Sequence, residues 1–166
     1  MAVNRDKVSA SAQKLLQSGK YDKAILELKK LVEDDPKDVR TLLKLGDTYV
    51  KMGARADAVS AYQLVANVYA DQGFFLKAVA VYKQMLRVDA SVATIHLKLA
   101  EMYQQLGLAN DSMQHYQQVA VLFEQQGKTA ESLDVRRLRV VADTENLPSR
   151  IKLAELFAKE GRQAEA

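Results

Sequence analysis

The sequence predicts an all-helical protein built from short repeated units, and three features support this fold class. Proline occurs only at Pro36 and Pro148, so long stretches of the 166 residues are free to form helices. Alanine, leucine, lysine, glutamine and glutamate, which favour helices, are abundant. Apolar residues recur three and four positions apart, as at Ile25, Leu28 and Leu31, which is the spacing of one helix face.

Glycines define the length of the repeated unit. Six of the seven glycines are separated by 34, 20, 34, 20 and 34 residues, namely Gly19, Gly53, Gly73, Gly107, Gly127 and Gly161. An interval of 34 residues is the length of a common helix–turn–helix repeat. Because glycine readily adopts the left-handed conformation that ends helices, we expect each of these positions to close one helix just before the next. The two intervals alternate, so the full pattern repeats every 54 residues.

Other residue types follow the same 54-residue period. It relates aromatic, small, apolar and charged positions, as in the sets Tyr49, Tyr103 and Phe157; Gly46, Ala100 and Ala154; Leu45, Leu99 and Leu153; and Lys44, Lys98 and Lys152. Chance does not align so many residue types on one spacing. Small residues let neighbouring helices approach closely, and large residues fill the remaining space.

Nine helices are expected in chain order, and each has a recognisable end. They cover residues 5–18, 21–34, 39–52, 55–72, 75–88, 93–106, 109–126, 129–142 and 147–160, and a tenth begins near Gln163. The first, third, fourth, sixth, seventh and ninth stop at the six glycines. The second, fifth and eighth stop at Asp35, Asp89 and Asp143, and Pro36 follows the first of these.

The fourth and seventh expected helices are longer than the others, and each fits two patterns. Seen from Gly53, Tyr62 and Ala66 suit the second helix of a repeat unit. Seen from Gly73, the same two residues together with Tyr69 suit the first helix of the next unit. One helix that serves two overlapping units would explain the interval of 20 residues between glycines.

These motifs resemble the tetratricopeptide repeat. Leu45, Gly46 and Tyr49 match its first-helix signature Leu-Gly-x-x-Tyr, residues 19–24 resemble its turn, and Asp35 with the following proline resembles its closing turn. The resemblance covers nearly the whole chain. It implies a right-handed superhelical solenoid of about nine antiparallel helices, organised as a single domain over 1–166 with a three-helix super-repeat of 54 residues.

The departures from the family pattern suggest a narrower resemblance. The counterparts of Pro36 are Ala90 and Thr144, and the shared long helix makes this a three-helix variant. Such a variant is similar to the N-terminal repeats of large delta-proteobacterial proteins of type IV pilus motility and cell polarity. That resemblance implies a small Ras-like polarity GTPase as a partner.

Composition and charge argue against several other classes of protein. No cysteine is present, which rules out disulfides and fits a reducing, cytoplasmic location. No apolar run is long enough to cross a membrane, and no signal peptide is recognisable. His96 and His115 lack the spacing of a metal site, and Gly127-Lys128-Thr129 lacks the earlier glycine of a phosphate-binding loop. We therefore expect neither an enzyme nor a bound cofactor.

The first helices of tetratricopeptide units line a groove, so the resemblance implies that the corresponding face binds a partner protein or peptide. In each super-repeat this face carries a lysine followed three residues later by an acid. We call the set the groove ladder, and it comprises Arg40, Leu43, Lys44, Asp47, Lys51, Leu97, Lys98, Glu101, Gln105, Lys152 and Glu155. The alternative interpretation is a solvated face with weak ion pairs.

An arginine cluster breaks the repeat. Arg136 stands where the 54-residue period predicts a core residue, as does Arg139, and Arg137 lies between them. A shallower or rotated helix would explain this, because arginine stems can cover apolar surface while the charged groups reach water. The alternative is a basic patch for an acidic partner or a phosphate. Nucleic acid is not expected, because the net charge is only +3 and Glu131 and Asp134 interrupt the longer basic stripe that such binding would need.

The repeats and the missing catalytic groups together predict a non-catalytic scaffold or adaptor that binds a partner protein on its superhelical surface. The alternative is a homotypic assembly element. A helix begins near Gln163 and no polar capping helix follows it, so we expect either a fragment of a longer array or self-association through the C-terminal helices.

Overall fold

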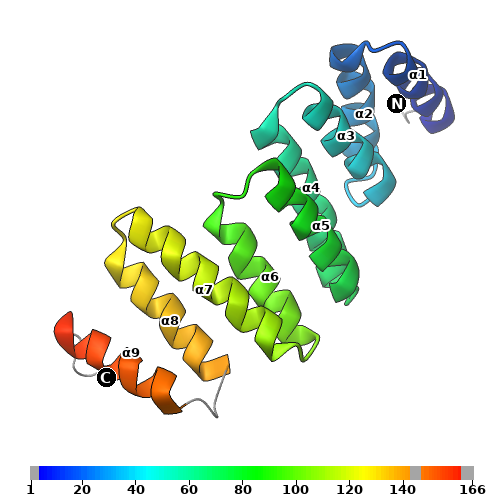
Figure 1. Cartoon of the computed structure of the whole chain (residues 1–166). Coiled ribbons are helices and arrows are strands. Elements are labelled where there is room, and N and C mark those ends of the chain that lie inside the picture. Colours follow the sequence, from blue (N-terminus) through cyan, green and yellow to red (C-terminus); the bar gives the residue numbers. More distant parts are fainter. Residues whose placement is uncertain (1–3, 143–146, 162–166) are drawn as a thin grey trace. The chain divides into compact units, whose positions relative to one another are not determined.

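The computed structural model describes residues 4–142 and 147–161, and these residues form nine helices. In chain order the helices are α1 (Arg5–Gln17), α2 (Tyr21–Asp34), α3 (Val39–Lys51), α4 (Arg55–Asp71), α5 (Phe75–Val88), α6 (Ala93–Gln105), α7 (Ala109–Gln125), α8 (Thr129–Ala142) and α9 (Leu147–Lys159) (Figure 1). Every expected helix is present, and its ends agree with the prediction to within one residue. The all-α fold is confirmed, and the expected tenth helix lies outside the described residues.

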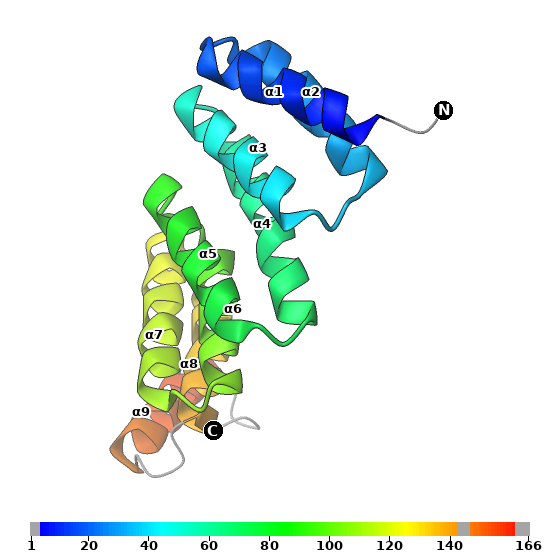
Figure 2. The same ribbon diagram turned by 90° about the vertical axis from the view of Figure 1, so that its right-hand side faces the viewer.

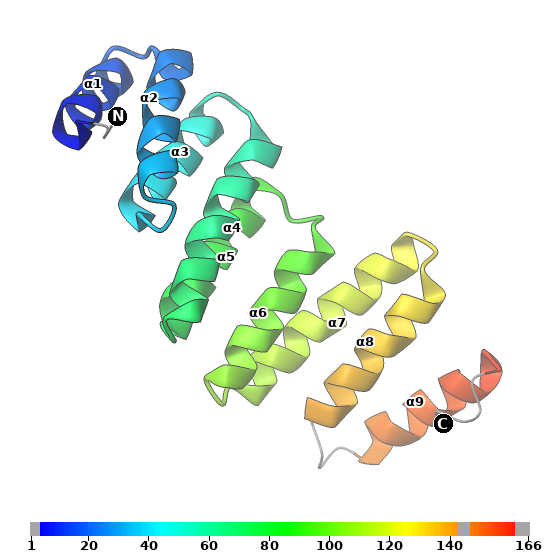
Figure 3. The same ribbon diagram turned by 180° about the vertical axis from the view of Figure 1, so that it is seen from behind.

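The chain divides into two compact units, Met1–Asp89 and Ala90–Ala166. In the first unit, each of the helices α1 to α4 packs on the next one along the chain (Figure 2). The second unit repeats this arrangement from α6 to α9 (Figure 3). Within its own unit, the long helix α4 contacts the helix before and the helix after, and α7 does the same, as the shared-helix interpretation predicts.

The turns confirm the role assigned to the six glycines. All six have positive φ angles between 70° and 75°. At Gly73, the glycine N–H donates to the carbonyl of Ala70 at 2.9 Å, and the N–H of Phe74 donates to the carbonyl of Tyr69 at 2.8 Å. This pair of bonds is the Schellman motif, which satisfies carbonyls that the helix end leaves open. The Phe74 ring also meets the edge of the Tyr69 ring, with 6.5 Å between centroids.

The start of α3 is fixed by Asp38. Its carboxylate accepts hydrogen bonds from the backbone N–H groups of Arg40 and Thr41 at 3.1 and 3.3 Å, and from the Thr41 hydroxyl at 2.6 Å. Arg5 of α1 reaches the same carboxylate and also pairs with Asp34 at 3.2 Å. Asp38 therefore caps α3 and connects it to α1 through Arg5, which also pairs with Asp34 of α2.

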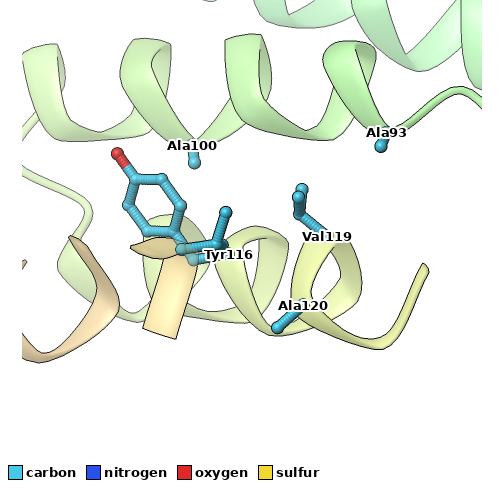
Figure 4. Packing of buried hydrophobic residues seen from close by; sticks show 6 residues of the cluster. Ala93, Ala100, Tyr116, Val119 and Ala120 are labelled. Atoms are coloured by element: carbon cyan, nitrogen blue, oxygen red, sulfur yellow. The ribbon is translucent and has the colours of Figure 1, made fainter. Parts of the chain in front are cut away.

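The core follows the 54-residue period. Ile25, Leu28 and Leu45 belong to a buried cluster in the first unit. In the second unit a cluster between α6 and α7 includes Tyr116 and Ala120 (Figure 4). The equivalent positions Leu45, Leu99 and Leu153 are all buried, so sequence repetition is also repetition of packing.

Gly46 is needed for a close approach between α3 and α4. A Cβ atom at this position would lie 2.5 Å from Cε1 of Tyr62, which is inside van der Waals contact. The missing side chain therefore lets the Tyr62 ring lie directly against the α3 backbone, where it is 1% exposed. This contact sets the geometry of the polar site described next.

Candidate functional site

In the first unit, the groove ladder runs along α3. Arg40, Asp47 and Lys51 are exposed, whereas Leu43 and Lys44 are half-buried. The Lys44 ammonium donates to Oε1 of Gln13 on α1 at 3.3 Å, rather than serving only as a solvated charge. In the first unit this face is therefore a mixed surface, in which exposed charged side chains lie on the same helix as the half-buried Leu43.

Asp47 is the anchor of a hydrogen-bond network that connects three helices. The hydroxyl of Tyr62 on α4 donates to Oδ1 of Asp47 at 2.6 Å. Nε2 of Gln84 on α5 donates to the Tyr62 hydroxyl at 2.8 Å and to Oδ1 of Asp47 at 3.3 Å. The carboxylate is thus held in one orientation by groups of the protein itself.

The protonation state of Tyr62 is consistent with this hydrogen-bond network. Burial of the phenol raises the pKa of Tyr62 well above its usual value, and the hydrogen bond to Asp47 and the negative charge of that carboxylate raise this pKa further. The bond from Gln84 acts in the opposite direction but does not offset these effects. Tyr62 therefore remains protonated and remains a donor to Asp47 at neutral pH.

An open pocket of about 660 Å³ adjoins this network and is formed by α3, α4 and α5. We call it the α3–α5 pocket. Its charged lining residues are Asp47, Lys51, Arg55 and Arg87, so cations outnumber acids. The side chain of Val50, which is 44% exposed, supplies apolar surface. Two groove-ladder residues, Asp47 and Lys51, thus line a pocket together with two arginines that the ladder prediction did not include.

In the second unit, the groove ladder continues on α6. Lys98 and Glu101 form an i,i+3 ion pair at 2.7 Å, as the alternative interpretation of a solvated face predicts, and Gln105 is exposed. Leu97 is half-buried and packs against the core cluster between α6 and α7, so it serves the core as well as the surface. Burial raises the pKa of Tyr116, and the charge of Glu101 raises it further.

The third segment of the groove ladder lies on α9, where Lys152 and Glu155 are exposed. Lys152 lines a pocket of about 270 Å³ together with Arg136 and Arg139 of α8. We call it the α8–α9 pocket. The prediction treated the ladder and the arginine cluster as separate surfaces, and the structure brings a member of one together with two members of the other. Arg137 is exposed on α8 and is not among the residues that line this pocket.

The two arginines of the α8–α9 pocket have different partners on α7. Arg136 forms an ion pair with Glu124 at 2.5 Å. Arg139 donates to the neutral side chain of Gln117, with Nη1 at 2.8 Å from Oε1. Both contacts place the guanidinium groups against α7 at the wall of the pocket, as expected if the arginine stems cover apolar surface while the charged groups reach a polar one.

The two histidines of the chain meet between α6 and α7. Nδ1 of His96 lies 2.9 Å from Nδ1 of His115, and the His115 ring stacks on Tyr103 with 5.5 Å between centroids. Burial lowers the pKa of His96 against the opposing effect of a backbone hydrogen bond at Ala90. The spacing of the two histidines in the sequence argued against a metal site, but it did not predict that they would contact each other.

Metal sites and membrane spans are both missing from the described parts of the chain. Within residues 4–142 and 147–161, no group of three or more His, Cys, Asp or Glu side chains is placed to hold a metal ion. The same residues include no helix that is both long and apolar enough to cross a membrane.

This chain is similar to a known family of repeats and to several solved structures. Family models of tetratricopeptide repeats match residues 12–53, 40–71 and 64–127. No curated protein sequence gives a match. Similar solved structures include MamA (41 to the end) from Desulfovibrio magneticus, at 15% identity over 99% of this chain and 97% of that one, with a TM-score of 0.47. Another is a thermophilic tetratricopeptide repeat protein of Thermus thermophilus, at 19% identity over 93% and 99% of the two chains, with a TM-score of 0.34.

Proposed function

Because this chain belongs to the tetratricopeptide repeat family, whose repeats generally act as protein-interaction modules, we propose that it is a scaffold that holds a partner protein on α3 and in the α3–α5 pocket. The observation that carries this proposal is the network of Asp47, Tyr62 and Gln84 at the edge of that pocket. Polar groups that are oriented in advance lose little conformational entropy on binding, so they favour recognition.

The composition of the α3–α5 pocket defines the partner surface that suits it. Lys51, Arg55 and Arg87 present positive charge, whereas Asp47 already accepts hydrogen bonds within the protein. Val50 offers an apolar contact between the charges. A partner segment that combines acidic and apolar side chains would complement this surface.

Charge reversal tests the proposal. Immobilised wild-type chain captures partners from extracts of the source organism, and the captured protein is then purified and titrated against variants. The Lys51→Glu/Arg87→Glu variant should bind at least about tenfold more weakly, because two attractive charge contacts become repulsive. The matched control is Lys23→Glu/Lys29→Glu on exposed positions of α2, which changes the net charge equally.

The control also defines failure. Equal affinity for both double variants would show that the partner does not use the α3–α5 pocket. If no captured protein binds again after purification, the proposal that this chain is a scaffold is contradicted. The resemblance to bacterial polarity proteins makes a small Ras-like GTPase the first purified candidate for this titration.

Self-association is a second proposed function, and exposed apolar side chains near the C-terminal helices favour it. Val141 of α8 is 64% exposed and Ile151 of α9 is 53% exposed. Covering such side chains with a second copy would remove apolar surface from water. If so, the wild-type chain sediments as a larger species at higher concentration and Val141→Asp/Ile151→Asp remains monomeric. A monomer at all concentrations for both proteins would refute this proposal.

A further inference from the structure

The α8–α9 pocket concentrates positive charge. Arg136 and Arg139 project from successive turns of α8, and Lys152 comes from α9. Among the described residues that line the pocket, none is acidic. Three cations that share one small cavity repel one another, and Glu124, which pairs with Arg136, offsets only part of this charge.

The repeat shows what this region would otherwise contain. By the 54-residue period, Arg136 corresponds to Leu28 and Tyr82, which are each only 1% exposed. Arg139 corresponds in the same way to Leu31 and Met85, which are 3% and 0% exposed. Two core positions of the earlier repeats have therefore become polar here.

Replacing these core residues with arginine reduces apolar packing. A cation in place of a buried leucine or methionine removes apolar contacts, and the α8–α9 pocket of about 270 Å³ lies beside these two arginines. Ion pairing within the protein offsets only part of the charge, because Arg136 has Glu124 as its partner whereas Arg139 has the neutral Gln117. An arginine has five N–H donors, so Arg139 retains donors for an incoming oxyanion.

Apolar surface lies directly beside these cations. Val140 and Leu156 are half-buried and line the pocket, as does Leu153, which is buried. Free phosphate would leave this apolar part of the pocket uncovered, whereas a peptide can place a carboxylate and an apolar side chain side by side. A nucleic-acid backbone, like free phosphate, brings no apolar side chain to Val140 and Leu156.

We propose that the α8–α9 pocket binds an acidic segment of a partner protein. Carboxylates of the segment accept hydrogen bonds from Arg139 and Lys152, and an adjacent apolar side chain packs on Val140 and Leu156. The planar guanidinium of Arg139 suits a carboxylate in bidentate geometry. The inference rests on the proposed scaffold function, and it adds a second site and the chemical class of its ligand.

The test uses the full chain and a fluorescent peptide in which aspartate and glutamate alternate with leucine. A companion peptide carries asparagine and glutamine in place of the acids. At low salt the wild-type chain should bind the acidic peptide at least about tenfold more tightly than the companion peptide, since charge-assisted hydrogen bonds are the strong ones. Measured in the Lys51→Glu/Arg87→Glu background, so that the α3–α5 pocket does not contribute, Arg139→Gln/Lys152→Gln should abolish that preference.

Matched variants separate the effect of losing the pocket cations from the effects of lower net charge and of unfolding. Lys128→Gln/Lys159→Gln removes two exposed lysines of the same unit that do not line the pocket, and it should retain the preference for the acidic peptide. Circular dichroism shows whether each variant is folded, and Arg139→Lys provides a milder replacement should the double variant unfold. Arg139→Lys keeps the charge but loses the bidentate geometry, so it should weaken the binding of the peptide and leave the protein helical.

Several outcomes would overturn the proposal. Equal binding of the acidic peptide to the wild-type chain and Arg139→Gln/Lys152→Gln would place the peptide elsewhere. Tighter binding of inorganic phosphate, or of single-stranded DNA with the same charge, would assign the pocket to another ligand. The Lys51→Glu/Arg87→Glu variant should retain the peptide, so failure of the α3–α5 pocket and failure of this site are distinguishable.

Discussion

At the scale of single residues, the absence of one side chain controls the first polar site. Gly46 and Ala100 are equivalent by the 54-residue period, and so are Tyr62 and Tyr116. Figure 4 shows Ala100 facing Tyr116, so the second unit accommodates a Cβ atom at this position. In that unit the tyrosine hydroxyl donates to Gln104 at 3.3 Å, whereas Tyr62 reaches Asp47 at 2.6 Å.

Gly46→Ala should therefore destabilise the protein although alanine favours helices by about 1 kcal/mol over glycine. The new Cβ would overlap the Tyr62 ring, and such overpacking costs about 1–3 kcal/mol. The net free energy of unfolding should fall, and the bond between Tyr62 and Asp47 should lengthen. Urea denaturation measures the first effect, and a spectroscopic titration of the tyrosines measures the second as a lower pKa of Tyr62.

The equivalent position provides the control. Ala100→Gly should also destabilise, by about 1 kcal/mol, but through backbone entropy and lost packing, without any change in the pKa of Tyr62. A stabilised Gly46→Ala protein would show that the contact between Gly46 and Tyr62 relaxes at little cost.

At the scale of helices, the stability of α3 depends on the contacts of Asp38, the residue that caps its N-terminus. Partial burial of the Asp38 carboxyl alone would raise its pKa, but hydrogen bonds from Thr41, the charge of Arg5 and the N–H of Arg40 outweigh this and lower the pKa below 3.8. Asp38→Ala should lower the free energy of unfolding by about 1 kcal/mol or more, because it removes a helix cap. Thermal or urea unfolding near pH 7 measures the loss.

The same group predicts a dependence on acid. Because the folded pKa of Asp38 lies below the unfolded value of 3.8, its stabilisation is present above that pH and is lost as pH falls through the folded pKa. The stability difference between wild type and Asp38→Asn should therefore shrink below about pH 4. A difference that stays constant down to about pH 2 would contradict the assigned interactions.

Helices α6 and α7 should show a different response to pH. The folded pKa of His96 is lower than 6.5, so the unfolded chain binds a proton there more readily than the folded chain. The stabilisation is complete above the unfolded pKa and declines as pH falls through 6.5 toward the folded value. The wild type should thus lose more stability than His96→Gln between about pH 7 and pH 5, as denaturation at each pH can measure. NMR titration of His96 provides the independent check.

The helices could be predicted from the sequence because their ends are local events. A glycine with positive φ, or an aspartate in extended conformation, marks a boundary without any knowledge of tertiary packing. The sites could be predicted only in part. Asp47 and Lys51 follow from helix periodicity, but Gln84 and Arg87 join them only because α5 packs on α4. The meeting of Arg139 with Lys152 likewise depends on packing of α8 on α9, which no spacing along one helix reveals.

At the scale of the whole molecule, each compact unit has a buried core of its own. One core includes Leu28 and Leu45, and another includes Tyr116 and Val119. Repeat proteins gain stability from contacts between neighbouring helices, so damage in one place need not spread uniformly. A single solenoid over 1–166 stays a prediction.

Leu99→Ala should reveal this subdivision. Leu99 is completely buried in α6, so truncation should cost about 2–5 kcal/mol. Hydrogen exchange should become faster in α6–α9 and remain unchanged in α1–α5, and Leu42→Ala in α3 should produce the reverse pattern. A uniform increase throughout both units for either variant would mean that the described chain unfolds as one cooperative body.

The packing of each helix on its neighbour in sequence also affects how the protein acquires its structure. Extensive helix–helix contacts within each unit join consecutive helices, so contacting residues are close along the chain and the contact order is low. Proteins of this kind close only short loops before native contacts form, and they fold within about microseconds to milliseconds. A ribosome adds residues far more slowly than that. Each newly made helix can therefore dock on the one synthesised just before it, so assembly can keep pace with translation.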